Sequence, residues 1–226
     1  MSDCSALLYF VKYPNTGTVK SRLAAAVGEE TARAIYKSFV LDFIEGRAGG
    51  SHPLLIVFDP PDAEAEVRNW LGAGYVYIPQ TGKDLGEKME NAFVRSFAEG
   101  FEGAILIGSD IPDLANHIIA EAFESLNTHK AVIGPAADGG YYLIGFQKKT
   151  FLPQIFHGIE WSTGSVFTET MNVFEECAYN THILPMWRDI DTLEDLGALV
   201  LRNRDTEFKR SRTISVINAI RDQLLL

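Results

Sequence analysis

Three cations and a glycine lie close together near the start of the chain, just after its first apolar run. Lys12, Lys20 and Arg22 surround Gly17 in a chain whose net charge is −10. Backbone N–H groups at the start of a helix, assisted by Lys and Arg side chains, bind phosphate readily. These four residues therefore predict a phosphate-binding loop for a nucleotide. A solvated loop with scattered cations is the alternative that the sequence leaves open.

Two acidic residues occupy positions typical of a divalent-cation site. Asp110 directly follows a buried apolar run, with Pro112 turning the chain behind it, and Asp191 falls where a strand ends and a helix begins. Mg²⁺ is usually held by one or two carboxylates together with substrate phosphates. The pair predicts a site for Mg²⁺ or Mn²⁺, and Asp110 is also a predicted catalytic residue. Each carboxylate could instead only cap the helix that follows it.

A second loop carries candidates for binding the nucleotide base. Gln80 has an amide that could bind a nucleobase edge, and Gly82 allows a ligand to approach the backbone closely. Asp84 is grouped with them as a nucleotide-binding residue. It is equally suited to be the N-cap of the next helix.

The acceptor side of the site is predicted from two loops in the second half of the chain. Asp138 could orient a hydroxyl group or act as a base, although Asp-Gly is more often a hairpin turn. Trp161 could stack on a ring, although an aromatic residue in a loop more often packs. Thr163 is also the expected N-cap of a helix that runs to about Cys177. The predicted acceptor-side residues are Gly139, Gly140, Trp161, Ser162 and Thr163.

Short apolar runs alternate with helical patterns along the whole chain, which predicts an α/β sandwich around a mostly parallel sheet. The last strands are shorter, so the sheet is expected to be mixed. We expect a single domain over residues 1–226, with residues 205–226 as a C-terminal helical extension. Asp191 or Thr192 should cap the helix that ends near residue 200. The expected strands are 6–11, 54–58, 75–78, 104–107, 131–133, 141–145 and 182–184.

Composition excludes several classes of protein. With 46% hydrophobic and 11% aromatic residues the chain is neither disordered nor fibrous. No apolar run reaches the ~20 residues needed to span a bilayer, so no membrane span is expected. The net negative charge of the chain argues against nucleic-acid binding. No secretory signal is apparent, and two cysteines suggest neither a disulfide framework nor a metal cage, so a cytoplasmic protein is expected.

Six motifs in this order resemble the glycosyltransferase A-like family of bacterial and archaeal proteins. Its members are proposed nucleotide-diphospho-sugar transferases, some of them tied to arsenosugar biosynthesis. More distant similarity is to molybdenum-cofactor nucleotidyltransferases and 2-phospholactate guanylyltransferase. The motifs lie at 12–23, 80–86, 108–112, 138–143, 161–163 and 189–196.

The resemblance implies a Rossmann-like three-layer sandwich with a mixed central sheet, known as the nucleotide-diphospho-sugar transferase fold. It assigns phosphates to the basic first loop and a divalent metal to Asp110 and Asp191. One departure is that Ser109-Asp110-Ile111 carries a single carboxylate where well-studied glycosyltransferases have Asp-x-Asp.

The expected function is transfer of a glycosyl group from a nucleotide sugar to a small-molecule acceptor, with a divalent metal. Two alternatives stay open: transfer of a nucleotidyl group from a nucleoside triphosphate with release of pyrophosphate, and nucleotide binding without turnover. The sequence assigns neither the base and sugar of the donor nor the oligomeric state, for which a homodimer is one option.

Overall fold

The computed structural model describes residues 5–15 and 19–220 of the chain, and in it a seven-stranded mixed sheet forms the centre. The strand order is β3-β2-β1-β4-β6-β5-β7, and β6 runs antiparallel to both of its neighbours. The other pairs are parallel, which confirms the mixed, mostly parallel sheet. The strands are β1 Ser5–Lys12, β2 Leu54–Asp59, β3 Val76–Pro79, β4 Gly103–Gly108, β5 Ala131–Pro135, β6 Tyr141–Gln147 and β7 Thr181–Ile183.

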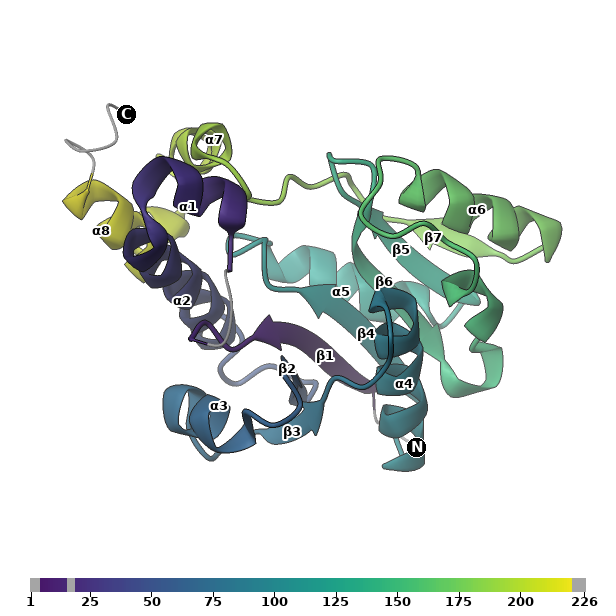
Figure 1. Ribbon diagram of the computed structural model, residues 1–226. Helices are drawn as coiled ribbons and strands as arrows, with labels where there is room; N and C mark the ends of the chain where they lie inside the picture. Colours follow the sequence, from purple (N-terminus) through teal and green to yellow (C-terminus); the bar gives the residue numbers. More distant parts are fainter. Residues whose placement is uncertain (1–4, 16–18, 221–226) are drawn as a thin grey trace.

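Helices cover both faces of this sheet, as Figure 1 shows. Alternate residues of β1 point to opposite sides, as the period of a strand requires. Tyr9 and Val11 pack with α2, α3 and α5, whereas Leu8 and Phe10 pack with α4 and α6. These two apolar layers make the three-layer sandwich. The helices are α1 Ser21–Val27, α2 Glu29–Glu45, α3 Glu64–Leu71, α4 Leu85–Ala98, α5 Asn116–Ser125, α6 Val166–Glu176, α7 Leu193–Asn203 and α8 Arg212–Ala219, with short 3₁₀ turns η1 Lys148–Thr150, η2 Pro153–Phe156 and η3 Glu207–Arg210.

A third apolar cluster joins α1, α2, α7 and α8 at one end of the molecule (Figure 1). Leu23 of α1, Leu199 of α7 and Ile217 of α8 are buried there. Of the expected C-terminal helical extension, η3 and α8 thus pack on the body of the protein, and residues 221–226 lie outside the described residues. This cluster fixes α1 and α7, and with them the segments that lead into these two helices.

Of the three helix caps that the sequence predicts, those of α4 and α7 are present and that of α6 is not. Asp84 accepts a hydrogen bond from the Glu87 N–H at 2.9 Å, and Thr192 caps α7 in a reciprocal pair with Asp195. The prediction for Thr163 was wrong, because α6 begins at Val166 with Ser165 at the N-cap. The Thr163 hydroxyl instead donates to the Glu160 carbonyl at 2.8 Å, which closes a separate turn before the helix.

Across residues 5–15 and 19–220, no helix is both long enough and apolar enough to cross a bilayer.

Candidate active site

The segments that follow β1 and β4 lie side by side at the C-terminal edge of the sheet, because these strands are parallel neighbours. Ligands of open α/β sheets usually bind at this edge. The hydroxyl group of Tyr36, in α2, contacts both segments. Its hydroxyl oxygen accepts a hydrogen bond from the Lys12 N–H at 2.9 Å and shares one with the Ser109 hydroxyl at 3.0 Å. The cation-bearing segment after β1 and the segment that carries Asp110 are therefore adjacent.

Lys20 lies between the two carboxylates that the sequence singled out. Its Nζ is 2.6 Å from Asp110 Oδ1 and 2.7 Å from Asp191 Oδ1, and its side chain is only 3% exposed. The backbone of Lys20 is left-handed, with φ 54° and ψ 52°, at the N-cap of α1. That conformation costs about 1 kcal/mol for a residue with a Cβ. The fold therefore places a buried ammonium between the carboxylate that follows β4 and the one that precedes α7. The expectation that a strand ends at Asp191 was wrong, because β7 already ends at Ile183.

The charges of this trio stabilise one another. Burial alone would lower the pKa of Lys20, but the two carboxylates outweigh it and raise this pKa above its ordinary value. Burial alone would raise the pKa of Asp191, but Lys20 holds it below the ordinary range, with a smaller contribution from the charge of Arg22. Lys20 is thus a cation and Asp191 an anion at neutral pH.

Asp189 is a further acidic residue of this edge to which the sequence analysis gave no role. Burial, followed by the charges of Asp138 and Asp191, raises its pKa to about 6. Ile190, which lies between Asp189 and Asp191 in the sequence, is fully buried. Its N–H donates to the Asp110 carbonyl at 2.9 Å. The Asp-x-Asp spacing with an apolar centre was the signal that could have identified Asp189, because alternate residues of an extended segment share a side.

The space between Asp110 and Asp191 holds the ammonium of Lys20, so a divalent cation would fit between these two carboxylates only in place of that ammonium. In the described part of the chain, no three His, Cys, Asp or Glu side chains come together as a complete metal site. Two carboxylates with the remaining ligands from phosphate and water is the usual coordination of Mg²⁺. The donor set therefore suits a metal that arrives with a phosphorylated substrate.

The other predicted phosphate ligands are partly accounted for. Lys12 and Arg22 are exposed, at the end of β1 and in the first turn of α1 respectively. Gly17 lies outside the described residues. The three positions of the first loop that the structure describes thus differ: two cations are free to meet solvent, and Lys20 is already engaged.

The loop after β3 is tightly built. Gln80 is buried, and its Nε2 donates to the Val57 carbonyl at 2.9 Å. Gly82 has φ 142°, and a Cβ there would stand 2.7 Å from the Glu87 Cβ and the Lys88 nitrogen. Glycine is required at this position by packing against α4, whatever its role toward a nucleotide.

The two predicted acceptor-side loops are in contact. A Cβ at Gly139, where φ is 92°, would stand 2.1 Å from the Gly164 carbonyl oxygen, so only glycine allows the two backbones to approach. Asp138 is exposed, and its Oδ1 accepts from the Gly140 N–H at 2.9 Å. These two loops lie near the acidic edge, by which we mean the part of the C-terminal edge that carries Asp110, Asp189 and Asp191. The charge of Asp138 acts on Asp189.

Trp161 packs inside this region. A Cβ at Gly86, in the first turn of α4, would lie 2.8 Å from its ring. Its ring also meets that of Tyr141 edge-on, with centroids 6.4 Å apart. Trp161 is half-buried, and Ser162, beside it, is exposed with φ 69°. The structure thus gives Trp161 a packing role, and stacking on a substrate remains a prediction.

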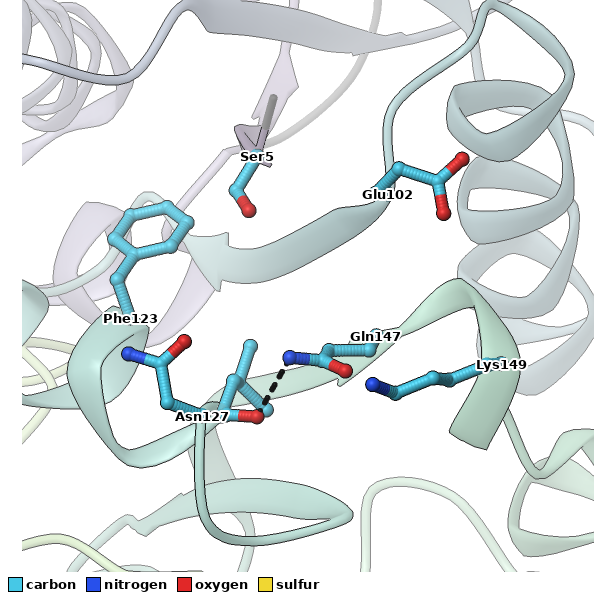
Figure 2. A pocket seen from close by; sticks show the side chains of 7 residues that line it. Ser5, Glu102, Phe123, Asn127, Gln147 and Lys149 are labelled. Atoms are coloured by element: carbon cyan, nitrogen blue, oxygen red, sulfur yellow. Dashed lines mark hydrogen bonds between the residues drawn. The ribbon is translucent and has the colours of Figure 1, made fainter. Parts of the chain in front are cut away.

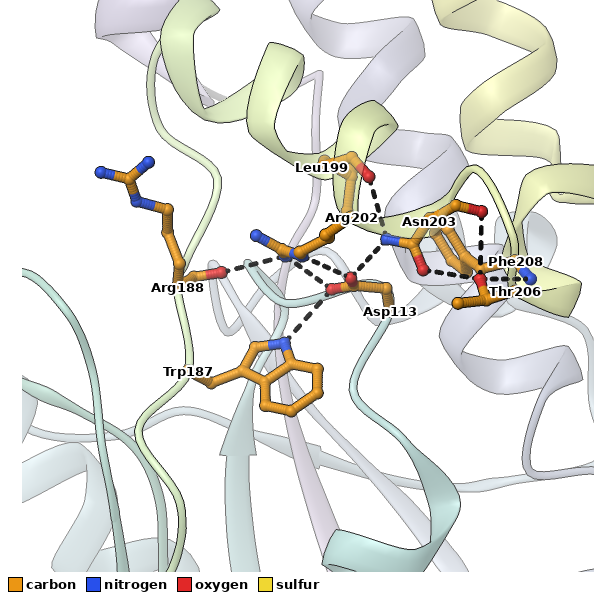
Figure 3. A network of polar contacts seen from close by, with 8 residues as sticks. All are labelled: Asp113, Trp187, Arg188, Leu199, Arg202, Asn203, Thr206 and Phe208. Carbon is orange, nitrogen blue, oxygen red and sulfur yellow. Dashed lines mark hydrogen bonds and ion pairs between the residues drawn. The ribbon is translucent and has the colours of Figure 1, made fainter.

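Asp113, three residues beyond Asp110, lies at the centre of a network of polar contacts within the protein (Figure 3). Its role is structural, and we do not assign it to the metal. Its side chain is 2% exposed and forms a two-pronged ion pair with Arg202 of α7 at 2.7 Å for each contact. Asn203 and Trp187 donate to the same carboxylate at 2.6 and 3.2 Å. This network ties the segment after β4 to α7 and so fixes the approach of Asp191 to Asp110.

A cavity of about 70 Å³ opens at the opposite edge of the sheet (Figure 2). It lies beside Ser5 at the start of β1 and Gln147 at the end of the antiparallel β6. Gln147 donates across it to the Leu126 carbonyl at 2.7 Å. A volume of this size suits a few water molecules and not a nucleotide. This cavity is therefore not a candidate site for a nucleotide.

The sheet order and the helices on both faces define the fold that nucleotidyltransferases share with nucleotide-diphospho-sugar transferases. Residues 45–163, more than half of the chain, match the family described as "Uncharacterized protein conserved in bacteria (DUF2064)". The chain belongs to this family.

Three known proteins are similar to this chain to different degrees. A proposed nucleotide-diphospho-sugar transferase from Desulfovibrio desulfuricans G20 is 39% identical, covers 100% of this chain and 97% of its own, and superposes with a TM-score of 0.94. A 2-phospho-L-lactate guanylyltransferase from Methanocaldococcus vulcanius is 25% identical over 131 residues, 58% of each protein, so the match spans little more than half of that relative. The manganese complex of Rv0371c from Mycobacterium tuberculosis H37Rv shares the fold, with 15% identity, a TM-score of 0.50 and coverage of 87% and 97%.

Proposed function

We propose that this protein transfers a glycosyl group from a nucleotide-diphospho-sugar to a small-molecule acceptor, with Mg²⁺ or Mn²⁺ at Asp110 and Asp191. The observation that carries the proposal is the pair of carboxylates that meet around a buried cation at the C-terminal edge of the sheet. The 39% identical protein from Desulfovibrio desulfuricans, a proposed nucleotide-diphospho-sugar transferase, supports the same reaction class.

Each part of the edge has a role in this proposal. Lys12 and Arg22 are exposed cations at the C-terminal edge and would bind the diphosphate of the donor. The metal would neutralise negative charge on the leaving diphosphate. Asp138 would orient or deprotonate the acceptor hydroxyl, since it is exposed beside the acidic edge.

The base and the acceptor are assigned to the two flanking loops. Gln80, Gly82 and Asp84 would form the base side, next to the start of α4. Gly139 and Gly140, with the loop from Trp161 to Thr163, would form the acceptor side. We also place the protein in the cytoplasm, where nucleotide sugars would be available to it.

A second candidate is nucleotidyl transfer, in which a substrate phosphate attacks the α-phosphate of a nucleoside triphosphate and pyrophosphate leaves. The observation in its favour is the similarity to a 2-phospho-L-lactate guanylyltransferase. The same edge would serve both reactions, because each needs cations and a metal around a chain of phosphates.

The leaving group distinguishes the two reactions. Purified protein with Mn²⁺ should release a nucleoside diphosphate or monophosphate from at least one member of a nucleotide-sugar panel, even far below the ~10 s⁻¹ typical of enzymes. Asp110→Asn should remove this release while the protein stays folded. Asp205→Asn is the control, because that carboxylate is exposed and pairs only locally with Arg204.

Release of pyrophosphate from a triphosphate, with no turnover of any nucleotide sugar, would replace the first proposal with the second. Binding of nucleotides without either product would leave the protein as a nucleotide-binding protein.

A further inference from the structure

Lys20 occupies the position that the proposed metal would need. Its Nζ contacts Oδ1 of both Asp110 and Asp191, 2.6 and 2.7 Å away. A Mg²⁺ ion binds oxygen at about 2.0–2.1 Å. The ammonium therefore fills the gap between the two carboxylates, and a divalent cation cannot enter this gap while the ammonium remains.

We infer that Lys20 is a built-in competitor of the divalent metal: it neutralises Asp110 and Asp191 in the metal-free protein and leaves them when the metal binds. This inference rests on the proposed function, in which the same two carboxylates hold the metal.

The competition follows from charge and burial. Two carboxylates that are brought together at a partly buried edge repel each other unless a cation lies between them. Lys20, at 3% exposure, supplies that cation from within the chain. Together an ammonium and a divalent ion would repel each other across the same few ångströms, so only one of the two can be bound.

The backbone makes the exchange feasible. Lys20 precedes α1 in a left-handed conformation, and its side chain makes no cap to that helix. Its displacement would therefore break the two ion pairs without removing a helix cap. The released ammonium would lie at the start of α1, near Arg22, where the phosphates of a substrate are proposed to bind. Metal binding would in this way make a third cation available to the substrate.

The first experiment measures the binding of Mn²⁺ alone, without nucleotide, by titration calorimetry. Lys20→Met keeps the length and apolar stem of the side chain but removes the ammonium. We expect Mn²⁺ to bind this variant about tenfold more tightly than the wild type, or more, within the usual range of coupling between mutually exclusive ligands.

The matched control is Arg22→Met, which removes a positive charge from the same helix. The charge of Arg22 also acts on Asp191, so a general electrostatic effect would appear in both variants. An equal gain in Mn²⁺ affinity for both variants, or no gain for Lys20→Met, overturns the inference. So does weaker binding by Lys20→Met, which would mean that Lys20 shapes the site.

A second measurement uses the wild-type protein and does not depend on the folding of a variant. Acetylation of lysines by an activated ester, read by mass spectrometry, should be slow at buried Lys20 and fast at exposed Lys12. Mn²⁺ should increase labelling of Lys20 severalfold and leave Lys12 unchanged. Unchanged labelling of Lys20 in saturating Mn²⁺ overturns the inference.

Neither readout involves turnover. If Mn²⁺ displaces Lys20 and yet no nucleotide sugar or triphosphate reacts, the proposed function fails and the competition stands. If turnover depends on Mn²⁺ while Lys20 stays unlabelled, the competition fails and the function stands.

Discussion

At the scale of single residues, Asp189 is an acidic group whose pKa is strongly changed by its surroundings. Its folded pKa of about 6 lies above the ordinary value of 3.8, so folding favours its protonated form. The stability that this provides is fully present below the unfolded pKa and is lost as the pH rises through the folded pKa. At neutral pH, ionised Asp189 therefore opposes folding.

Replacing Asp189 by Asn should stabilise the protein at pH 7. Because the group is only partly buried, solvent screening reduces the gain to about 1 kcal/mol of unfolding free energy. Urea unfolding at pH 7 and near pH 4 measures it, and the gain should shrink toward zero at the lower pH. A gain of equal size at both pH values would show that charge is not its cause.

Two Asp–Arg pairs of this chain allow a matched comparison of burial. Asp113 is 2% exposed and pairs with Arg202, itself 28% exposed, whereas Asp205 is 84% exposed and pairs with Arg204. Asp113→Asn should lower the unfolding free energy by about 3 kcal/mol, because a guanidinium is left partly buried without its counter-charge.

Asp205→Asn should change the unfolding free energy by less than about 0.5 kcal/mol, since an exposed pair contributes little. Chemical denaturation of the Asp113→Asn and Asp205→Asn variants tests these two predictions. Similar losses in the two variants would contradict the structural role given to Asp113.

At the scale of elements, a carboxylate of α2 caps the start of α8, in addition to the apolar cluster that joins the two helices. Asp42 accepts hydrogen bonds from the backbone N–H groups of Arg212 at 3.0 Å and Thr213 at 2.7 Å. These are N–H groups of the first turn of α8, which have no partner within the helix. Asp42 therefore acts as a second cap, supplied from another helix, beside the N-cap Ser211.

Asp42→Ala should lower the unfolding free energy by about 1–2 kcal/mol, as the loss of a cap does. Hydrogen exchange resolved by segment is the measurement, and the amides of residues 212–219 should exchange faster while those of β1 and β4 do not change. Asp84→Ala is the matched variant, because it removes the cap of α4 and should affect residues 85–98 instead. Faster exchange throughout the protein would show that α8 does not open separately.

At the scale of the whole molecule, the candidate site joins segments that are far apart along the chain. Lys20 and Asp191 are 171 residues apart, and Asp110 comes from between them. A ligand that bridges these segments should stabilise the complete fold. At 100 times its dissociation constant it adds about 2.7 kcal/mol, or roughly 5–10 °C in Tm for a chain of this size.

A thermal-shift panel of nucleotides and nucleotide sugars, each with and without Mn²⁺, measures this stabilisation. The shift should need Mn²⁺, and Asp110→Asn should abolish it. An equal shift without Mn²⁺ would contradict the assignment of the metal to this edge.

The sequence by itself determined the elements. Apolar runs such as 104–107 and 131–133 are strands, and the residues after them are loops at one edge, because period and turn residues are local properties of a chain. It also singled out Lys20, Asp110 and Asp191 as candidate residues for chemistry, of which only Asp110 closely follows a strand. It misplaced the start of α6, where a turn closed by Thr163 precedes the helix.

Only the tertiary structure decided which of these residues meet. Lys20 was expected to face phosphates, and the packing of α1 on α7 brings it between Asp110 and Asp191 instead. Asp113 gave no signal of its partner, because Arg202 follows it by 89 residues. The raised pKa of Asp189 likewise depends on burial and on Asp138. Charges act over a few ångströms in space, and distance along the chain does not fix distance in space.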